Sequence, residues 1–223
     1  MNFLDLRPGA SVEGDKIPCF RSEEKADKYV YLMAGTHGDE VEGVYVLQKL
    51  FNWLQEKEDL SLPLIIIPIL NVDGYRSGTR VNSHGVDLNR NLPANSWNTE
   101  FKKAKYNPGP GPSSEPENQF LIKLFDKFSP KLILSFHSWK PMLNYNGDCE
   151  EIAKLLHKFN SYPMVKEIEN YPTPGSLGDF GPEKYNAPVL TFECPTLAEG
   201  VTLKGIWEEN MTGLKELFAS NIL

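Results

Sequence analysis

Three side chains of the types that bind zinc lie in two distant parts of the chain. His37 and Glu40 are three residues apart in the string THGDE, and His137 ends the apolar run of residues 131–137. Two histidines and one carboxylate are a ligand set of catalytic zinc, and they leave a fourth position open for water. Bound zinc makes such a water a nucleophile at neutral pH. The pattern therefore predicts hydrolysis by water rather than by a side-chain nucleophile.

Each part of this set also has an ordinary interpretation. Residues three apart on a first helical turn lie on one face, so His37 and Glu40 can share an ion. The same pair is equally compatible with a histidine that packs a loop and a glutamate at a helix N-terminus. His137 by itself is equally compatible with a core or loop histidine. The zinc hypothesis therefore depends on further groups elsewhere in the chain.

A loop segment supplies two cations and two amides. Arg80 precedes Val81 and Asn82, and Asn89, Arg90 and Asn91 stand in the string GVDLNRNLP. Guanidinium groups suit the bidentate capture of a carboxylate and the stabilisation of an oxyanion. The alternative is that these arginines and asparagines only brace the loop and its turns.

Glu193 ends the apolar strand-like run of residues 188–192. A carboxylate in such a place is costly unless it has a partner or a task. Burial near a metal would tune its pKa for proton transfer between water and a leaving amine. The alternative is a carboxylate at a strand end that reaches solvent.

The elements expected to position these groups alternate along the chain. Runs that are apolar on both faces predict interior strands, and apolar residues at helical spacing predict amphipathic helices. The expected strands cover residues 29–34, 64–70, 132–136 and 188–192, and the expected helices cover 39–58, 114–128, 150–159 and 202–219. This order predicts an α/β sandwich with a wholly or partly parallel sheet. The ligand-type residues follow strand ends, where such sheets place their sites.

Three local features qualify this outline. Residues 71–114 are rich in Asn, Gly, Pro and Ser and show little periodicity, so we interpret them as a long functional loop. Ser114 and Glu117 have the spacing of a capping box for the helix that follows. Pro68 is expected to end the second strand or to mark a bulge there.

Composition narrows the class of protein. A chain of 223 residues with 40% hydrophobic and 24% charged residues suits a single globular domain spanning 1–223. The net charge of -7, without a basic cluster, argues against nucleic acid as a partner. We expect no membrane span and no secretory signal. Three cysteines at unrelated spacings favour a reducing cytoplasm over a disulfide framework.

Taken together, the motifs resemble those of M14-class zinc carboxypeptidases. The strings HGDE, DLNRN, SFH and TFE (residues 37–40, 87–91, 135–137 and 191–193) occur in that family's order. The strings AGTHGDE, RVN before GVD, GPSSEPE and YPTPGS resemble its bacterial branch, the murein peptide amidases. The resemblance runs from about residue 30 to the end of the chain. It implies a three-layer sandwich with a central mixed sheet flanked by helices.

The resemblance also implies roles for individual residues. His37, Glu40 and His137 match the ligands of one zinc ion, and Glu193 matches the general base that later protonates the leaving group. Arg80 matches the arginine that polarises the scissile carbonyl and stabilises the oxyanion. Asn89 and Arg90 match the pair that grips the carboxylate of the leaving residue, and Tyr171 matches the family's mobile tyrosine. Asp179 departs from the amidases, and we interpret it as either a partner for a substrate ammonium group or an idle solvated acid.

The function that the resemblance implies is cleavage of γ-D-glutamyl-meso-diaminopimelate in small murein peptides, during cell-wall recycling in a bacterial cytoplasm. One alternative is another M14-type carboxypeptidase, or an N-acyl amino acid deacylase like succinylglutamate desuccinylase and aspartoacylase. Another is a non-catalytic module that binds a peptide carboxylate through Arg80 and Arg90. The oligomeric state is left open by the sequence.

Overall fold

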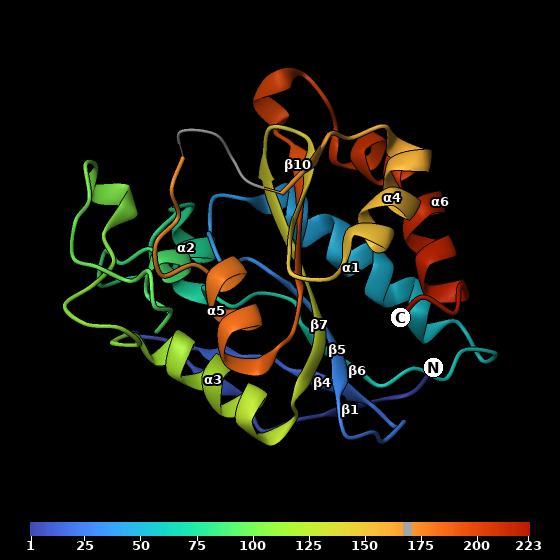
Figure 1. The fold of residues 1–223 in the computed structure, drawn as a ribbon, viewed down its shortest axis with the longest axis horizontal. Coiled ribbons are helices and arrows are strands. Elements are labelled where there is room, and N and C mark those ends of the chain that lie inside the picture. Colours follow the sequence, from blue (N-terminus) through green and yellow to red (C-terminus); the bar gives the residue numbers. More distant parts are fainter. Residues whose placement is uncertain (167–170) are drawn as a thin grey trace.

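The computed structural model describes residues 1–166 and 171–223, and a mixed eight-stranded sheet forms the centre of this described part (Figure 1). Strands β6, β5, β7 and β10 run parallel to one another. The pairs β1–β4, β4–β6 and β10–β8 are antiparallel, and β9 pairs in parallel with β8. In spatial order the strands are β1 (Phe3–Asp5), β4 (Phe20–Ser22), β6 (Leu64–Ile67), β5 (Tyr29–Ala34), β7 (Pro130–Trp139), β10 (Val189–Pro195), β8 (Met142–Asn146) and β9 (Met164–Val165). A separate small hairpin consists of β2 (Gly9–Ala10) and β3 (Lys16–Ile17).

Helices cover both faces of the sheet and complete three layers. One face carries α1 (Val41–Gln55), α4 (Glu150–Asn160) and α6 (Leu203–Ala219), and the other side holds α2 (Val72–Ser77), α3 (Pro116–Lys127) and α5 (Leu177–Tyr185) (Figure 1). Three 3-10 turns are η1 (Leu88–Arg90), η2 (Ala104–Tyr106) and η3 (Leu197–Glu199). The sequence-based expectation of a three-layer sandwich around a mixed sheet is confirmed.

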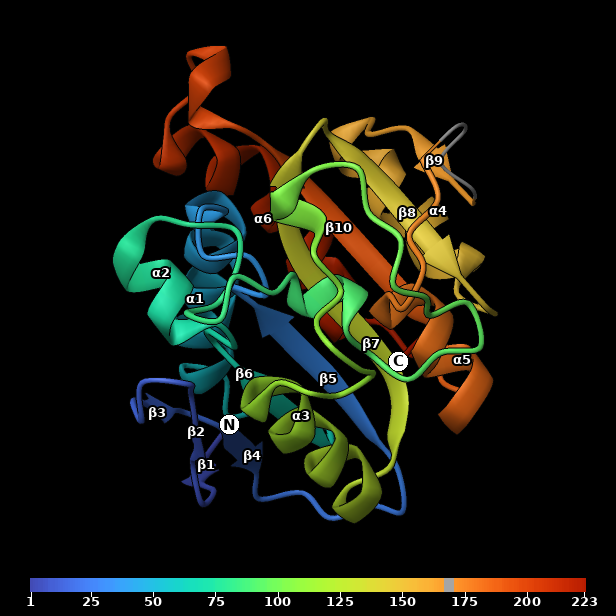
Figure 2. The same cartoon turned by 90° about the vertical axis from the view of Figure 1, so that its left-hand side faces the viewer.

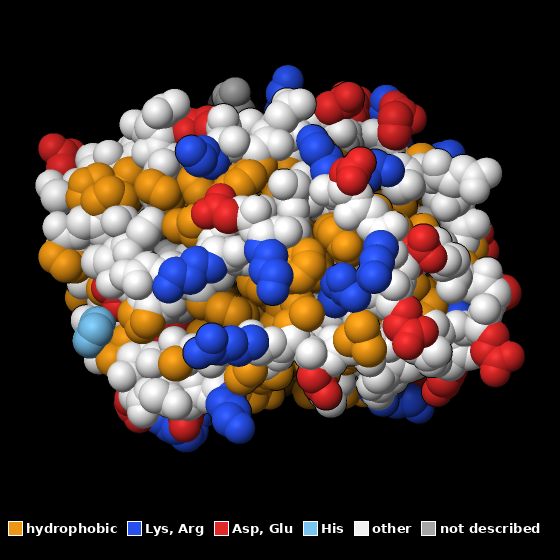
Figure 3. All heavy atoms as spheres, turned by 90° about the horizontal axis from the view of Figure 1, so that it is seen from below, with side chains coloured by type: hydrophobic (Ala, Val, Ile, Leu, Met, Phe, Trp, Pro, Cys, Tyr) orange, Lys and Arg blue, Asp and Glu red, His pale blue; other side chains and the backbone are white. Residues whose placement is uncertain are grey.

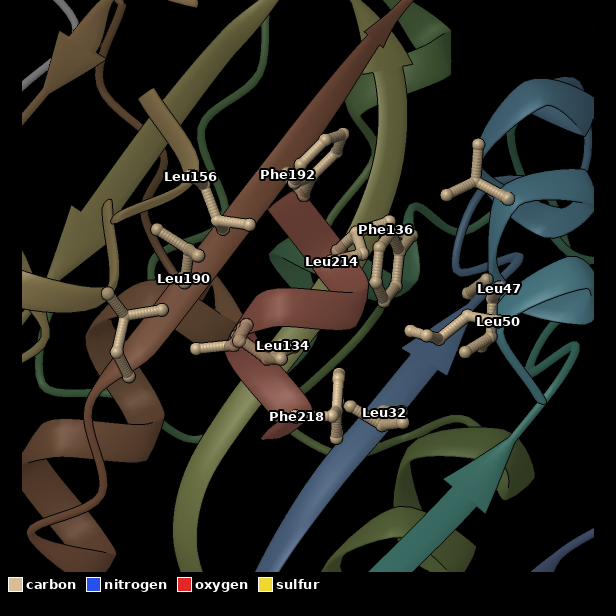
Figure 4. Packing of buried hydrophobic residues seen from close by; sticks show 14 of the residues in the cluster. Leu32, Leu47, Leu50, Leu134, Phe136, Leu156, Leu190, Phe192, Leu214 and Phe218 are labelled. Carbon is tan, nitrogen blue, oxygen red and sulfur yellow. The ribbon is translucent and has the colours of Figure 1, made fainter. Parts of the chain in front are cut away.

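The core lies on both sides of the sheet because alternate residues of each central strand point to opposite faces. Leu32, Leu134, Phe136, Leu190 and Phe192 pack toward α1, α4 and α6, as Figure 4 shows. The residues between them, such as Tyr31, Ile133 and Val189, pack under α3 and α5. Burial on both faces explains why these strands read as continuous apolar runs.

Most of the expected elements are present, and β6 ends before Pro68 as expected. The long-loop interpretation of residues 71–114 is wrong in part, because the segment contains α2 and two 3-10 turns. Asn71 caps α2 by accepting from the N–H of Gly74, and Gly78 ends it in the left-handed region. A helix of six residues is too short to show apolar periodicity.

The expected capping box is also wrong. The N-cap of α3 is Glu115, whose side chain makes no cap bond, and Pro116 begins the helix. The Ser114 hydroxyl donates to Glu115 instead, at 2.6 Å. Glu117 accepts from the Asn82 amide and from the N–H of Val12. The Ser114 hydroxyl also accepts from the Asn91 amide at 2.9 Å, so its neighbour Glu115 and partners distant in sequence hold the two side chains that the local pattern assigned to the helix end.

The first 28 residues carry elements that local patterns did not predict. Strands β1 and β4 extend the sheet beyond β6, and the turn between β2 and β3 clamps α2. In that clamp Ser11 and the N–H of Glu13 donate to the two oxygens of Asp73, at 2.7 and 3.0 Å. Strands of two or three residues are too short to be recognised by alternation alone.

The molecular surface mixes charges of both signs. Figure 3, seen from below, shows basic and acidic side chains interspersed with apolar ones on that face. The three cysteines are buried and free. Among the described residues, no helix has both the length and the apolar character that crossing a bilayer requires.

Candidate functional site

The ligand-type residues converge at the carboxyl ends of the parallel strands. His37 and Glu40 lie between β5 and α1, and His137 lies near the end of β7. Two glycines allow the close approach of the elements. A Cβ on Gly38 would lie 1.9 Å from the backbone of Gly74, and one on Gly43 would lie 2.9 Å from the backbone N of His137. Because these two residues lack a Cβ, the segment after β5 packs closely against α2, and the first turn of α1 packs closely against β7.

His37, Glu40 and His137 form a tight trio. Nδ1 of His37 lies 2.8 Å from one oxygen of Glu40, and Nδ1 of His137 lies 2.7 Å from the other. The two Nδ1 atoms are 3.2 Å apart. Burial opposes the ionisation of Glu40, but the two imidazoles outweigh it and hold the pKa of the carboxyl well below its usual range. One ligand atom from each residue therefore faces a common centre.

This donor set fits zinc. A tetrahedral zinc about 2.0–2.1 Å from two imidazole nitrogens holds them about 3.3 Å apart, close to the observed spacing of the Nδ1 atoms. Nε2 of His37 points at Asp87 and Nε2 of His137 points at Ser135, at 3.1 and 3.0 Å. Such outer partners keep the ring proton on Nε2 and leave the Nδ1 lone pair free for a metal.

Asp87 has no role of its own among the sequence-based expectations, and the structure places it between His37 and Arg80. Its Oδ1 contacts His37, and its Oδ2 accepts from Nε of Arg80 at 3.0 Å. Burial raises the pKa of this carboxyl, but His37 and Arg80 outweigh burial and lower it far below its ordinary value. The Asp87 carboxylate also raises the pKa of His37, against the effect of burial. In the sequence, the only signal for Asp87 is its place in the string DLNRN beside Asn89 and Arg90. Its complete burial, which requires partners for the carboxylate, is visible only in the structure.

Arg80 lies against the metal-ligand trio. Its guanidinium is 3.3 Å from Glu40 and 3.0 Å from Asp87. Burial lowers the pKa of Arg80, while the two carboxylates raise it, and the net shift is upward. The group is therefore a fixed cation beside the trio, 16% exposed and open to a ligand.

Glu193 lies beside the trio on the neighbouring strand. It is the register partner of His137 in the parallel pair of β10 and β7, so both side chains point to the same face. Oε2 of Glu193 is buried and has no hydrogen-bond partner within the described residues. Burial raises the pKa of Glu193 to about 7, and His137 offsets this only in part. The carboxyl is thus poised to exchange a proton near neutral pH.

Arg90 and Asn89 form a second polar group from η1. Arg90 is buried, and its guanidinium donates to the Asn89 carbonyl at 2.7 Å. In the described part of the chain, no carboxylate lies within ion-pair distance of Arg90. The Asn89 side-chain oxygen accepts from the N–H of Leu177 at 2.8 Å, which directs its amide nitrogen elsewhere. A buried cation without an anion and a free amide donor are suited to a carboxylate ligand.

Tyr171 lies in an aromatic group that sequence reasoning did not find. Its hydroxyl donates to that of Tyr106 at 2.8 Å, and its ring packs on Trp139 with centroids 5.2 Å apart. Burial, together with this bond, raises the pKa of Tyr171 to about 12. Tyr106 comes from η2, within the segment interpreted as loop. Tyr106 lies outside every sequence motif, so no local pattern indicated it.

Apart from the buried Asp87 and Ser135, these groups line one cleft of about 770 Å³. Figure 2 faces this side of the sheet, where the green segment after α2 crosses in front of β7 and β10. Beyond Glu193, the cleft floor contains Thr191 and its register partner Asn144 on β8. Asp179 of α5 lines the same part and accepts from the Ser96 hydroxyl at 2.5 Å. The cleft therefore combines the trio, the two arginines Arg80 and Arg90, and an inner end, defined here as the polar residues Thr191, Asn144 and Asp179.

Comparison with known proteins gives a consistent result. A family model described as "Zinc carboxypeptidase" matches residues 6–202. The match begins in the N-terminal strands, so the expectation that the resemblance starts near residue 30 is corrected. Murein peptide amidase A of Vibrio campbellii is 30% identical over 88% of this chain and 81% of its own length.

Solved structures are similar over nearly the whole chain. The crystal structure of the murein-tripeptide amidase of Escherichia coli O157 superposes with a TM-score of 0.80, at 26% identity, and covers 97% of this chain and 92% of that one. Carboxypeptidase A of Helicoverpa armigera gives a TM-score of 0.79 at 19% identity over 98% of this chain and 69% of that one. The second likeness is one of fold.

Proposed function

The chain belongs to the zinc carboxypeptidase family and is a hydrolytic enzyme, and on this premise we propose that it cleaves an amide bond in small murein peptides. The bond we propose is that between γ-D-glutamate and meso-diaminopimelate. The observation that carries the chemistry is the pairing of Glu193 with His137, which puts an unpartnered buried carboxyl oxygen beside the trio of His37, Glu40 and His137.

We assign the trio to one zinc ion. When bound there, zinc would supply a Lewis acid that polarises the scissile carbonyl and lowers the pKa of water. Zinc needs the Nδ1 atoms of both imidazoles unprotonated, and the Nε2 atoms, which face Asp87 and Ser135, can carry the ring protons instead. The Glu40 carboxylate is ionised, and Ser138 N–H donates to its Oε2 at 3.2 Å. These contacts hold the ligand atoms ready without further rearrangement.

Glu193 and Arg80 divide the remaining work at the reacting carbonyl. Glu193 accepts a proton from the attacking water and passes it to the nitrogen of the leaving residue. A pKa raised to about 7 suits both steps, since the carboxyl must gain and lose the proton in each cycle. Arg80 stabilises the oxyanion, because its guanidinium is already fixed by Asp87 and needs little reorganisation.

The leaving residue is oriented by its carboxylate. Arg90 lacks an anionic partner among the described side chains, and the Asn89 amide is free to donate. Together they would fix one end of the substrate and make cleavage depend on a free carboxylate next to the scissile bond. We assign to Tyr171, which lines the same cleft, the closing of that end.

The inner end of the cleft supports a polar leaving residue. Thr191, Asn144 and Asp179 offer hydroxyl, amide and carboxylate groups rather than an apolar pocket. A diaminopimelate side chain ends in an ammonium and a carboxylate, and both need polar partners when they leave water. The relatives named as murein peptide amidases support the same substrate class. A bacterial cytoplasm, where such peptides are recycled, is the location that we propose.

The test is a substrate panel read by mass spectrometry. The zinc-loaded protein is incubated with L-alanyl-γ-D-glutamyl-meso-diaminopimelate, with an ordinary L-peptide, and with N-acyl amino acids, each with and without chelator. We expect release of free diaminopimelate, abolished by chelator and restored by zinc. Preferential cleavage of the L-peptide or the acyl amino acids would replace this proposal by the carboxypeptidase or deacylase alternative.

A further inference from the structure

One aromatic residue contacts three of the side chains that the proposed function assigns to the substrate, namely Arg80, Arg90 and Tyr171. The ring of Tyr106 lies under both arginines of the cleft, with its centroid 5.3 Å from Cζ of Arg80 and 5.8 Å from Cζ of Arg90. Its hydroxyl accepts from that of Tyr171 at 2.8 Å. Tyr106 lines the cleft itself and is half-buried. No motif of the sequence includes this residue.

The ring matters most to Arg90. Arg80 has two carboxylate partners, Glu40 and Asp87, whereas Arg90 has no ion-pair partner in the described part of the chain. The π face of an aromatic ring attracts a guanidinium and restricts its position, and the attraction is stronger where water is excluded. Tyr106 therefore compensates part of the Arg90 charge without filling the site that an anion would take.

The hydroxyl of Tyr106 matters to Tyr171. The ring of Tyr171 is held on one side by Trp139, and its hydroxyl is held by Tyr106. This bond lowers the pKa of Tyr106, with Lys105 acting in the same direction, and the bond adds to the burial that raises the pKa of Tyr171.

We propose that Tyr106 is a positioning residue, which holds Arg90 and Tyr171 where they receive the carboxylate of the leaving residue and keeps Arg80 beside them for the oxyanion. The inference rests on the proposed function, since it takes the roles of these three residues from it. The ring sets where the guanidiniums lie, and the hydroxyl sets where the Tyr171 phenol lies. Loss of the ring and loss of the hydroxyl should therefore have different signatures.

The hydroxyl is tested by a double-mutant cycle. Tyr106→Phe and Tyr171→Phe each remove the same hydrogen bond, so each should raise KM by about 3- to 10-fold with little change in kcat. The double variant should be no worse than either single one, because the bond can be lost only once. Tyr75→Phe, in an exposed tyrosine of α2, is the matched control and should behave like the wild type. Additive losses in the double variant would overturn the role of the hydroxyl.

The ring is tested by Tyr106→Leu with two substrates, the murein peptide and its analogue with a carboxamide in place of the leaving residue's α-carboxylate. The variant should lose kcat/KM mainly on the carboxylate substrate, and so reduce the preference for it. Tyr106→Phe, which keeps the ring, should retain that preference. Equal losses on both substrates in Tyr106→Leu, with normal folding and zinc content, would overturn the proposal. If that variant does not fold, the phenylalanine cycle decides alone.

Arg90→Gln separates failure of this inference from failure of the proposed function. A preference for the carboxylate substrate that survives Arg90→Gln would show that Arg90 does not bind the carboxylate. The carboxylate role that the proposed function gives to Arg90 and the role of Tyr106 would then fall together, while the substrate panel would still decide the reaction. If Arg90→Gln removes the preference while Tyr106→Leu keeps it, the proposed function stands and the role of Tyr106 is refuted. We expect both variants to reduce it.

Discussion

Asp87 joins a metal-ligand candidate to an oxyanion-binding candidate, since its carboxylate contacts both His37 and Arg80. Oδ1 is 3.1 Å from Nε2 of His37, and Oδ2 is 3.0 Å from Nε of Arg80. Oδ1 also accepts from the N–H of Asn89 at 2.9 Å. One buried carboxylate thus orients the imidazole, the guanidinium and the start of η1. The same side chain therefore positions groups of both the proposed metal centre and the proposed substrate site.

Asp87→Asn should weaken zinc binding and slow turnover together. An asparagine has one acceptor oxygen and one donor nitrogen, so it can serve His37 or Arg80 but not both. We expect zinc affinity to fall by about 10- to 100-fold, measured by competition with a chromophoric chelator. Asp73→Asn is the control, because Asp73 is equally buried but clamps α2 to the β2–β3 turn. Unchanged zinc affinity in Asp87→Asn would contradict the anchoring role.

Glu193→Gln should abolish turnover while zinc stays bound. The amide keeps the shape of the side chain but cannot accept a proton, so we expect a loss in kcat of about 10²- to 10⁴-fold. Zinc content by elemental analysis should equal that of the wild type. Near-normal activity would refute the assignment of Glu193.

Cys194→Ala should retain activity. Cys194 is fully buried, and burial followed by Glu193 and other carboxylates raises its pKa well above the ordinary value, so the thiol stays protonated. A protonated thiol is a poor nucleophile, and the side chain packs as a small apolar group. Steady-state kinetics on the same substrate check this. A loss as large as that of Glu193→Gln would point to a thiol mechanism instead.

The metal-free protein should show the raised pKa of Glu193 as a pH-dependent stability. The folded state holds the proton up to about pH 7, against an ordinary value of 4.5. This contribution is therefore fully present below about pH 4.5 and is lost as pH rises through 7. We expect the free energy of unfolding of Glu193→Gln, measured with denaturant in the presence of chelator, to rise relative to that of the wild type by on the order of 3 kcal/mol between pH 4.5 and pH 8. A difference that stays constant over this range would contradict the shift.

Asp179→Asn should reduce selectivity for an ammonium group on the leaving side chain. Asparagine still accepts from Ser96 but carries no charge, so the preference for lysine over norleucine at that position should fall by about 2- to 5-fold. Glu183→Gln, one turn later on α5, is the matched control because Glu183 accepts from Asn95 N–H outside the cleft. An unchanged preference would show that Asp179 is a solvated acid that only accepts the hydrogen bond from Ser96.

The chemistry of the protein could be predicted from the sequence to a large extent. Strands β5, β6, β7 and β10 are recognisable as buried runs, and ligand-type residues at strand ends indicate where they lie in the fold. Local patterns also predict which face of a strand a residue takes, so Glu193 and Thr191 necessarily share one. The motifs in order pointed to the family, and the family match confirms it.

Local reasoning failed where a tertiary partner decided the structure. The side chains of Ser114 and Glu117 have the spacing of a capping box. Ser114 instead bonds to its neighbour Glu115 and to the distant Asn91, and Glu117 bonds to Asn82 and Val12. Helix α2 depends on its cap and on the clamp from the N-terminal hairpin more than on periodicity.

The sequence by itself determined which residue types are available for metal binding, proton transfer and carboxylate capture, because these depend on side-chain chemistry and on the ends of predictable elements. Only the tertiary structure decided their partners: Glu193 beside His137, Asp87 between His37 and Arg80, and Tyr106 under both arginines. Most of these partners lie far apart in sequence, and the two histidines of the trio, His37 and His137, are 100 residues apart. Strand register and loop packing, which no local pattern specifies, bring them together.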